Sequence, residues 1–325
     1  MFDVNWRQIG KTEIRVSPVA LGCWPISGMT SLGVNETDSL ATLRKCADVG
    51  INFLDTAHCY GADGQSERLI AKALGNRRDQ IVIATKGGIH WDAAGQRIFD
   101  ARPDTLRREC ELSLKRLQTD HVDLLYLHAP DPNVPVTESA GELQRLLEEG
   151  KTRAVGVSNL SVGQLAAFHA VCPISAFQPH YNMLQREIER DALPWCRRHD
   201  VSVMVYWPLL KGLLAGKLRR DHRFGRGDGR AKYAMFHGAE WELNQDLVDR
   251  LRSIAQSAGK TVAQVVVNWT IHRPGITAAL CGAKRADQIE ETAGAMAWQL
   301  SVEQLAEIEC ALAERGTPIS QTAVG

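Results

Sequence analysis

The 325-residue sequence lacks the features that mark several large classes of protein. No apolar run approaches the ~20 residues that a transmembrane helix needs, and the N-terminal MFDVNWRQIGK does not resemble a signal peptide. Lysine plus arginine equals aspartate plus glutamate at 38 each, so no net charge attracts nucleic acid. We therefore expect a cytoplasmic protein that interacts with neither membranes nor nucleic acid.

Metal and dinucleotide motifs are missing as well. The eight cysteines form no CxxC pair and no cysteine–histidine spacing of a zinc site, which predicts reduced thiols and no bound metal. The first apolar run ends in LGCW without the HxH ligand pair of a metal-dependent barrel hydrolase, which disfavours that class. No GxGxxG follows a predicted strand, so a Rossmann domain is excluded.

Eight short and nearly continuous apolar runs are present, and amphipathic segments separate them. Such runs are typical of strands buried on both faces of a parallel sheet. The alternation favours an α/β fold of the (β/α)8 TIM-barrel type over an open doubly wound sheet, and no linker divides the chain, so we expect one domain over residues 1–325. The predicted strands lie within 16–22, 51–57, 81–87, 122–128, 153–159, 174–180, 201–209 and 276–283.

The intervening segments have helical patterns with recognisable ends. After Pro103, apolar residues fall on one face at positions 106, 110, 114 and 117. Capping boxes are predicted for Ser161 with Gln164, Thr261 with Gln264 and Ser301 with Gln304. C-terminal glycines are predicted at Gly50, Gly75 and Gly150.

Two further segments stand apart from the alternation. Residues 6–17 read as a β-hairpin around Gly10, which we expect to close the bottom of the barrel. Residues 211–242 exceed the usual connection length, which indicates either a functional lid or partial disorder. Tyr233, Phe236 and Trp241 in this segment could add walls to a pocket.

Polar residues close or follow several predicted strands, where barrels carry their chemistry. Lys86 would bury its charge unless a carboxylate lay nearby, and Asp55 on the neighbouring strand can supply one. Such an ammonium is expected to lower the pKa of an adjacent phenol, which makes Tyr60 a candidate proton shuttle. His128 can orient a carbonyl by a hydrogen bond. Taken singly, Asp55 or His128 could instead be an ordinary hydrogen-bonded core residue.

At this point the sequence resembles the aldo-keto reductase superfamily over almost its full length. The resemblance rests on LDTAHCYG with SERLIAKAL, on IATKGG, on YLHAPD and on GVSN with FQPHYN, in that order. It implies that Tyr60 is the general acid in carbonyl reduction, that Lys86 and Asp55 adjust the pKa of its phenol, and that His128 orients the carbonyl. It also implies a nicotinamide cofactor as the hydride donor.

The resemblance extends to residues expected to bind that cofactor. Ser158, Asn159 and Gln178 would hold the carboxamide, and Tyr206 would stack on the nicotinamide. YWPLLKGLLAGK resembles a phosphate-binding stretch of the family, although Trp207 stands where serine is frequent. CGAKRADQIEET resembles the adenosine-binding motif, with Cys281 and Thr292 in place of proline and asparagine. These two stretches would contribute Trp207, Pro208, Leu209, Gly212, Lys217, Gly282, Lys284, Gln288, Glu291 and Thr292.

Lys284 is the expected counter-charge for an adenosine 2′-phosphate, which favours NADPH, with NADH also possible. Its alternative role is that of a solvated lysine at a helix start. Trp24 and Trp91 fall on loops over the barrel mouth and are expected to line a substrate pocket, unless their loops fold inward to the core. A pocket of this kind, without an obvious anchoring arginine, suggests neutral carbonyl substrates such as aldehydes or sugar-like compounds.

Two other functions remain open on the sequence. A Schiff-base aldolase could also place a lysine, here Lys86, at the end of a barrel strand. A cofactor-binding regulatory subunit without significant turnover could retain the same four residues. The sequence does not indicate an oligomeric state.

Overall fold

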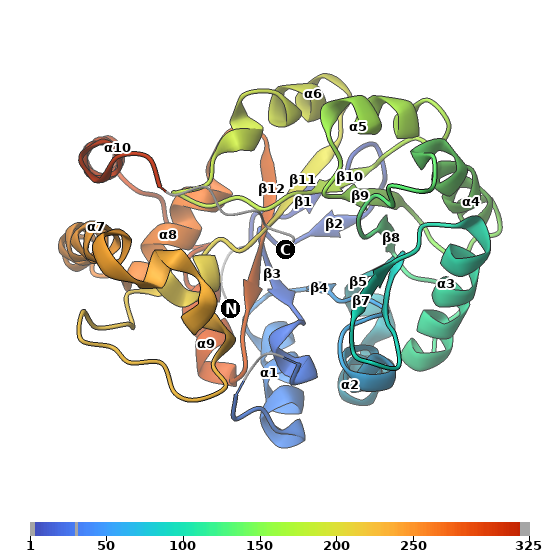
Figure 1. The fold of residues 1–325 in the computed structure, drawn as a ribbon, viewed down its shortest axis with the longest axis horizontal. Coiled ribbons are helices and arrows are strands. Elements are labelled where there is room, and N and C mark those ends of the chain that lie inside the picture. The colour runs from blue at the N-terminus through green and yellow to red at the C-terminus, as the bar shows by residue number, and fades with distance from the viewer. Residues whose placement is uncertain (1–3, 30–31, 319–325) are drawn as a thin grey trace.

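The computed structural model describes residues 4–29 and 32–318, and its centre is a closed barrel of eight parallel strands (Figure 1). Each strand lies within one of the eight predicted ranges, which confirms the predicted (β/α)8 fold. The strands are β3 (Val19–Gly22), β4 (Phe53–Asp55), β5 (Val82–Gly87), β8 (Leu124–Leu127), β9 (Val155–Ser158), β10 (Ala176–Gln178), β11 (Ser202–Tyr206) and β12 (Ile276–Gly282). They follow one another around the barrel in this order, and β12 pairs with β3 to close it.

Helices surround the strands, and α10 lies beside α7 on the outside (Figure 1). The helices are α1 (Glu36–Asp48), α2 (Gln65–Leu74), α3 (Pro103–Leu117), α4 (Val136–Glu148), α5 (Val162–His169), α6 (Ala192–Arg198), α7 (Gly238–Ser257), α8 (Val262–Ile271), α9 (Ala286–Ala293) and α10 (Val302–Arg315). None of the helices in the described ranges is long and apolar enough to cross a membrane.

Local sequence signals account for most helix ends. Pro103 begins α3, and the predicted apolar face of that helix is buried. All three predicted capping boxes are present, at the starts of α5, α8 and α10. Gly50 and Gly150 adopt the left-handed conformation after α1 and α4. Gly75 keeps right-handed values because the chain continues from α2 into a 3₁₀ helix, Gly75–Gln80.

The N-terminal hairpin closes one end of the barrel, as predicted. Its strands β1 (Arg7–Gln8) and β2 (Arg15–Val16) pair antiparallel, and the hairpin's buried Ile9 and Ile14 join the core inside the barrel. Arg7 donates hydrogen bonds to the carbonyls of residues 276 and 277 where β12 begins. The hairpin therefore lies at the N-terminal ends of the strands and leaves the opposite end for chemistry.

The interior of the barrel is tightly filled at one glycine. A Cβ on Gly156 of β9 would lie 2.4 Å from Cε1 of Tyr126 and 3.0 Å from the carbonyl oxygen of Ala176. Tyr126 is fully buried in the close-packed barrel interior, so its ring has little freedom to move away. Gly156 thus provides the space that this large side chain occupies.

We expect Gly156→Ala to lower the free energy of unfolding by about 1–3 kcal/mol, because the added methyl group overpacks the barrel. Urea unfolding followed by circular dichroism measures the change. Gly163→Ala is the matched control, since nothing lies within 4 Å of a Cβ at that helical position. Equal stability of the two variants would show that the Tyr126 ring does not require the space.

Two features of the fold go beyond the prediction. A second hairpin, β6 (Ile89–Trp91) with β7 (Arg97–Phe99), follows β5 at the open end of the barrel. Residues 211–242 contain short 3₁₀ helices, and α7 already begins within them. The expectation that Phe236 and Trp241 line a pocket is wrong, because both are buried against the hydrophobic core between barrel and helices. Tyr233 remains partly exposed.

Candidate active site

Polar side chains form one layer at the C-terminal ends of the barrel strands. Alternate residues of a barrel strand point inward, and in β5 this alternation takes Val82 and Ala84 into the inner core and then reaches Lys86. In the neighbouring strands, too, the inward positions carry apolar or small residues first and a polar residue last. The polar residues on this inward register are Asp55, Lys86, His128, Ser158, Gln178 and Tyr206.

Lys86 lies at the centre of this layer. Its Nζ donates hydrogen bonds to Oδ1 of Asp55 at 2.6 Å and to the carbonyl oxygen of Thr56 at 2.7 Å. The hydroxyl of Tyr60 is 3.5 Å from the same Nζ. The Lys86 side chain has no exposed surface, and its buried charge is tolerated because a carboxylate and a carbonyl surround it. An amine held in this way is a poor nucleophile, which opposes the Schiff-base alternative.

Asp55 receives a second hydrogen bond that the sequence did not predict. Nε2 of Gln178 donates to Oδ2 of Asp55 at 2.7 Å. Gln178 ends β10, which lies across the barrel from β4, so this bond spans the interior. Burial raises the pKa of Asp55, whereas the ammonium of Lys86 and the amide of Gln178 oppose this rise. Gln178 therefore helps to position the carboxylate that accompanies Lys86.

The phenol of Tyr60 is more strongly protonated than expected. Burial raises its pKa well above the ordinary value, and the carboxylate of Asp55 raises it further. The expected lowering by Lys86 is not found, because Asp55 lies much closer to the ammonium than Tyr60 does and offsets its field. At neutral pH the Tyr60 hydroxyl therefore carries its proton and can donate it.

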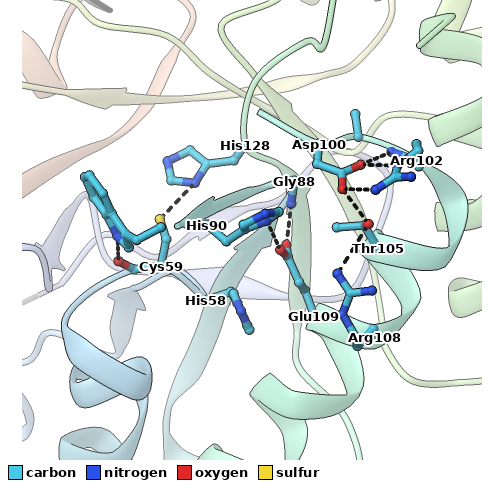
Figure 2. A network of polar contacts seen from close by, with 12 residues as sticks. His58, Cys59, Gly88, His90, Asp100, Arg102, Thr105, Arg108, Glu109 and His128 are labelled. Carbon is cyan, nitrogen blue, oxygen red and sulfur yellow. Dashed lines mark hydrogen bonds and ion pairs between the residues drawn. The ribbon is translucent and has the colours of Figure 1, made fainter. Parts of the chain in front are cut away.

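His128 directly follows β8 and faces the same space. Its ring centroid lies 5.9 Å from that of Tyr60. Burial and the nearby charge of Lys86 lower its pKa well below the usual value, so the imidazole is neutral. Figure 2 shows its Nδ1 facing Sγ of Cys59, at 3.7 Å. A neutral imidazole beside a protonated phenol can hydrogen-bond a carbonyl without adding a charge.

The two tryptophans predicted to lie over the barrel mouth are both beside Tyr60. The rings of Trp24 and Tyr60 meet edge to face with centroids 4.9 Å apart. Trp91 ends β6, and its Nε1 donates to the carbonyl oxygen of Cys59 at 2.8 Å. A cleft of about 620 Å³ opens beside Cys59 and Trp91, with Met29 on its rim. Trp91 thus lines the cleft, whereas Trp24 lies against the ring of Tyr60.

The base of the second hairpin is held by a buried carboxylate. In Figure 2 the side chain of Glu109, from α3, accepts a hydrogen bond from the backbone N–H of Gly88 and faces Nδ1 of His90. The two distances are 2.6 and 3.0 Å. Because Trp91 follows His90 directly, this contact fixes the strand that carries the indole.

The residues predicted for the carboxamide and nicotinamide are adjacent and already bonded to one another. Oγ of Ser158 donates to the backbone carbonyl of Gln178 at 2.6 Å. Nδ2 of Asn159 donates to the backbone carbonyl of His128 at 3.1 Å, and its Oδ1 accepts a 2.8 Å bond from the hydroxyl of Tyr206. Asn159 has a positive φ of 61°, which asparagine tolerates better than most residues. Amide and hydroxyl groups therefore gather beside a half-exposed aromatic ring.

The residues predicted for the far end of the cofactor come from two segments that touch. The carboxylate of Glu291 in α9 lies 3.0 Å from Nζ of Lys217. Oε1 of Gln288 accepts from the backbone N–H of Lys284 at 2.8 Å, and Thr292 donates its hydroxyl back to its own helix. β12 ends at Gly282, and Lys284 comes two residues later. The turn after β11 contains Trp207, Pro208, Leu209 and Gly212.

This end of the barrel carries cations that the sequence had not assigned. Nζ of Lys211 lies 3.7 Å from the ring centroid of Trp207 and 4.4 Å from that of Tyr233. Burial lowers the pKa of Lys211 to about 8. The guanidinium of Arg230 lies near Gly212, whose Cβ position is 3.5 Å from Nη1. With Lys284, these groups suit a ligand that has an amide at one end and phosphates at the other. Only the fold brings Arg230 to this place, so no sequence motif could have identified it.

No metal centre accompanies these groups in the described parts of the chain. Within residues 4–29 and 32–318, no cluster of three histidine, cysteine, aspartate or glutamate side chains could hold a metal ion.

Comparisons of sequence place the chain among known proteins. The family model described as the aldo/keto reductase family matches residues 18–313. The aldo-keto reductase YhdN of Bacillus subtilis (strain 168) is 36% identical over 312 residues, which cover 95% of this chain and 94% of the relative. The probable aldo-keto reductase 1 of Glycine max is 31% identical over 302 residues, with coverages of 93% and 87%.

Solved structures agree with this placement. The glycerol dehydrogenase AKR11B4 from Gluconobacter oxydans superposes with a TM-score of 0.90 at 34% identity, covering 99% of each chain. The aldo-keto reductase AKR11C1 from Bacillus halodurans, in its holo form, gives a TM-score of 0.78 at 26% identity, covering 95% of this chain and 96% of that chain. The similarity thus extends over nearly the whole barrel.

Proposed function

We propose, given that this chain belongs to the aldo-keto reductase family and is an oxidoreductase, that it reduces aldehyde or ketone carbonyls to alcohols with NADPH. The observation that carries this proposal is the protonated hydroxyl of Tyr60, 3.5 Å from the buried ammonium of Lys86. Negative charge that develops on the carbonyl oxygen is neutralised by the proton of Tyr60 and passes to the phenol oxygen, where the fixed ammonium of Lys86 stabilises it.

Each residue of the tetrad has a distinct part in this proposal. Tyr60 donates the proton to the carbonyl oxygen, and Lys86 stabilises the charge left on the phenol oxygen. Asp55 keeps Lys86 in place through its 2.6 Å bond. The neutral imidazole of His128 donates a hydrogen bond that orients the carbonyl. The nicotinamide, when bound, supplies the hydride to the carbonyl carbon.

The cofactor would extend from the amide cluster to the cations at the other end. Ser158, Asn159 and Gln178 offer donors and acceptors for a carboxamide, and the half-exposed ring of Tyr206 offers a stacking face. Trp207, Pro208, Leu209, Gly212 and Lys217 would border the pyrophosphate. Gly282, Lys284, Gln288, Glu291 and Thr292 would border the adenosine. Lys284 favours NADPH, and NADH could bind more weakly.

The substrate would be a small neutral carbonyl compound bound between Trp24 and Trp91. One structural relative is a glycerol dehydrogenase, which supports small hydroxylated compounds as substrates or products. The barrel mouth offers two indole faces and the neutral His128 there, which suits uncharged ligands. We also infer that residues 1–325 act as one domain, because the hairpin and the outer helices pack on the same barrel. The free cysteines support a reducing compartment, so we infer that this domain acts in the cytoplasm.

A screen of NADPH oxidation over aldehydes, ketones, keto-sugars and quinones tests the proposal. We expect turnover of aldehydes or hydroxyketones, because their carbonyl and hydroxyl groups can hydrogen-bond the phenol of Tyr60 and the neutral imidazole of His128. Each active compound should be retested with NADH, for which a higher KM is expected. Absence of NADPH and NADH oxidation with every class, by protein that binds the cofactor, would contradict the proposed activity.

A further inference from the structure

Asp228 and Arg230 form a preorganised ion pair on the segment between β11 and α7. The Asp228 carboxylate accepts two bonds from Nε of Arg230, at 3.0 and 3.2 Å, and one from Nη2 at 2.7 Å. It also accepts the backbone N–H of Arg230 at 3.0 Å. The guanidinium carbon lies 5.1 Å from the ring centroid of Phe224, so the arginine is held by the carboxylate and packs against the aromatic ring.

This ion pair lies between the two segments proposed to bind the phosphates of the cofactor. On one side, Nη1 of Arg230 is 3.5 Å from the Cβ position of Gly212. On the other side, Nζ of Lys284 donates to the backbone carbonyl of Leu32 at 3.3 Å, and the side chain of Leu32 lies 3.8 Å from the Cβ position of Gly227. The segment Gly227–Arg230 thus lies close to both Gly212 and Lys284, and together they border one site.

The charges at this spot suit a phosphate. Hydrogen bonds from Arg230 lower the pKa of Asp228, so this carboxylate is ionised, and Lys284 lowers the pKa a little further. Burial lowers the pKa of Lys284, and the like charge of Arg230 adds to the lowering while Asp228 opposes it. Two cations therefore share one internal carboxylate and retain a net charge of about +1 for a ligand to neutralise.

We infer that Arg230 is a second binding residue for the 2′-phosphate of NADPH, acting together with Lys284. This inference rests on the proposed cofactor and deepens it. In the structure Asp228 holds the guanidinium through Nε and Nη2, and the edge formed by Nη1 and Nη2 remains for a bound phosphate. Arginine binds phosphate through two parallel N–H donors, which lysine cannot do, so Arg230 would supply the geometric selectivity that Lys284 alone lacks.

The chemistry favours the 2′-phosphate over the pyrophosphate as the partner of Arg230. A phosphate monoester carries between one and two negative charges at pH 7, with three terminal oxygens, and can compete with a carboxylate for a guanidinium. Each phosphorus of a pyrophosphate diester carries only one charge on two free oxygens. Lys284, the second cation at the spot, lies on the segment that resembles the adenosine motif.

Calorimetric titration with 2′,5′-ADP and with 5′-AMP tests the inference without any substrate. The two nucleotides share the adenosine and the 5′-phosphate and differ in the 2′-phosphate. We expect Arg230→Ala to weaken binding of 2′,5′-ADP by about 10- to 100-fold and binding of 5′-AMP by less than about twofold. Arg230→Lys should recover part of the affinity, because it restores the charge but not the fork.

Arg226→Ala is the matched control, since it removes the same charge from an exposed position in the same segment. It should leave both affinities close to those of the wild type, and thermal melting should show that all variants are folded. Combined with Lys284→Ala, the Arg230→Ala change should lower the affinity for 2′,5′-ADP further, by a factor that differs from its effect in the wild type, because the two cations bind one group.

Three outcomes would overturn the inference: equal weakening of both nucleotides, an unchanged affinity for 2′,5′-ADP, or no binding of 2′,5′-ADP to the wild type. Equal weakening would assign Arg230 to the 5′-phosphate side instead. These results are separable from the proposed reaction. Selective loss of 2′,5′-ADP binding in a protein without carbonyl turnover would support the site and contradict only the activity.

Discussion

Replacement of Tyr60 by phenylalanine is expected to lower the kcat of carbonyl reduction by at least about 10³-fold, because general acids contribute roughly 10²- to 10⁴-fold and, among the described residues, Tyr60 supplies the hydroxyl that Lys86 contacts. The ring itself remains, so the edge-to-face contact with Trp24 and the shape of the pocket are preserved. Affinity for NADPH, measured by fluorescence titration, should change little. Substantial turnover by this variant would show that another group supplies the proton.

The pH dependence of the wild type provides a second test of the same residue. Because burial raises the pKa of Tyr60, the phenol remains protonated through neutral pH, and the proton needed for reduction is available there. Reduction should therefore be nearly constant from about pH 6 to 9 and fall only above the ordinary phenol pKa of about 10. Alcohol oxidation needs the phenolate, so its rate should rise with pH from about pH 6 to 9. A fall in reduction near pH 7 would contradict the raised pKa.

Replacement of Lys86 by methionine should abolish activity and also destabilise the fold by about 3–5 kcal/mol, because it leaves the carboxylate of Asp55 buried without its cation. Without Lys86, burial raises the pKa of Asp55 unopposed by the ammonium. A raised folded-state pKa makes the loss of stability grow as the pH rises from about 4 through that pKa. Urea unfolding at pH 5 and pH 8 measures this difference.

The double variant Asp55→Asn, Lys86→Met separates the two effects of Lys86. It removes the unpaired charge and keeps an amide that can accept the bond from Gln178, so most of the stability should return. Activity should not return, because the cation beside Tyr60 is still missing. A single Lys86→Met variant as stable as the wild type at both pH values would show that the Asp55–Lys86 pair adds no net stability.

The sequence was sufficient to predict the barrel and to bring its reactive residues to one end. Strands buried on both faces must be apolar along their length, so a polar residue that closes such a strand is conspicuous. Lys86 and Asp55 could be paired because a buried ammonium requires a counter-charge and their strands are neighbours. These inferences use contacts between strands that are adjacent in the barrel.

Contacts across the barrel and between remote loops could not be predicted. The bond from Gln178 to Asp55 depends on closure of the barrel, which places β10 opposite β4. The meeting of Arg230 with Gly212 depends on the path of a long connection that has no motif. The direction of the Tyr60 pKa was also predicted incorrectly, because burial of the phenol raises it and the nearby carboxylate of Asp55 raises it further, and residue types alone do not give that burial.

The hydrogen bond from the indole of Trp91 to the carbonyl of Cys59 links substrate selectivity to the rate of turnover, two properties that enzyme engineers usually try to vary separately. Residue 59 precedes Tyr60, so a smaller side chain at position 91 would widen the cleft and at the same time release the backbone beside the proposed acid. Variants selected there for bulkier substrates would then turn over slowly with every substrate. Position 29, whose side chain borders the cleft, offers a site where selectivity can be altered with less risk to the rate.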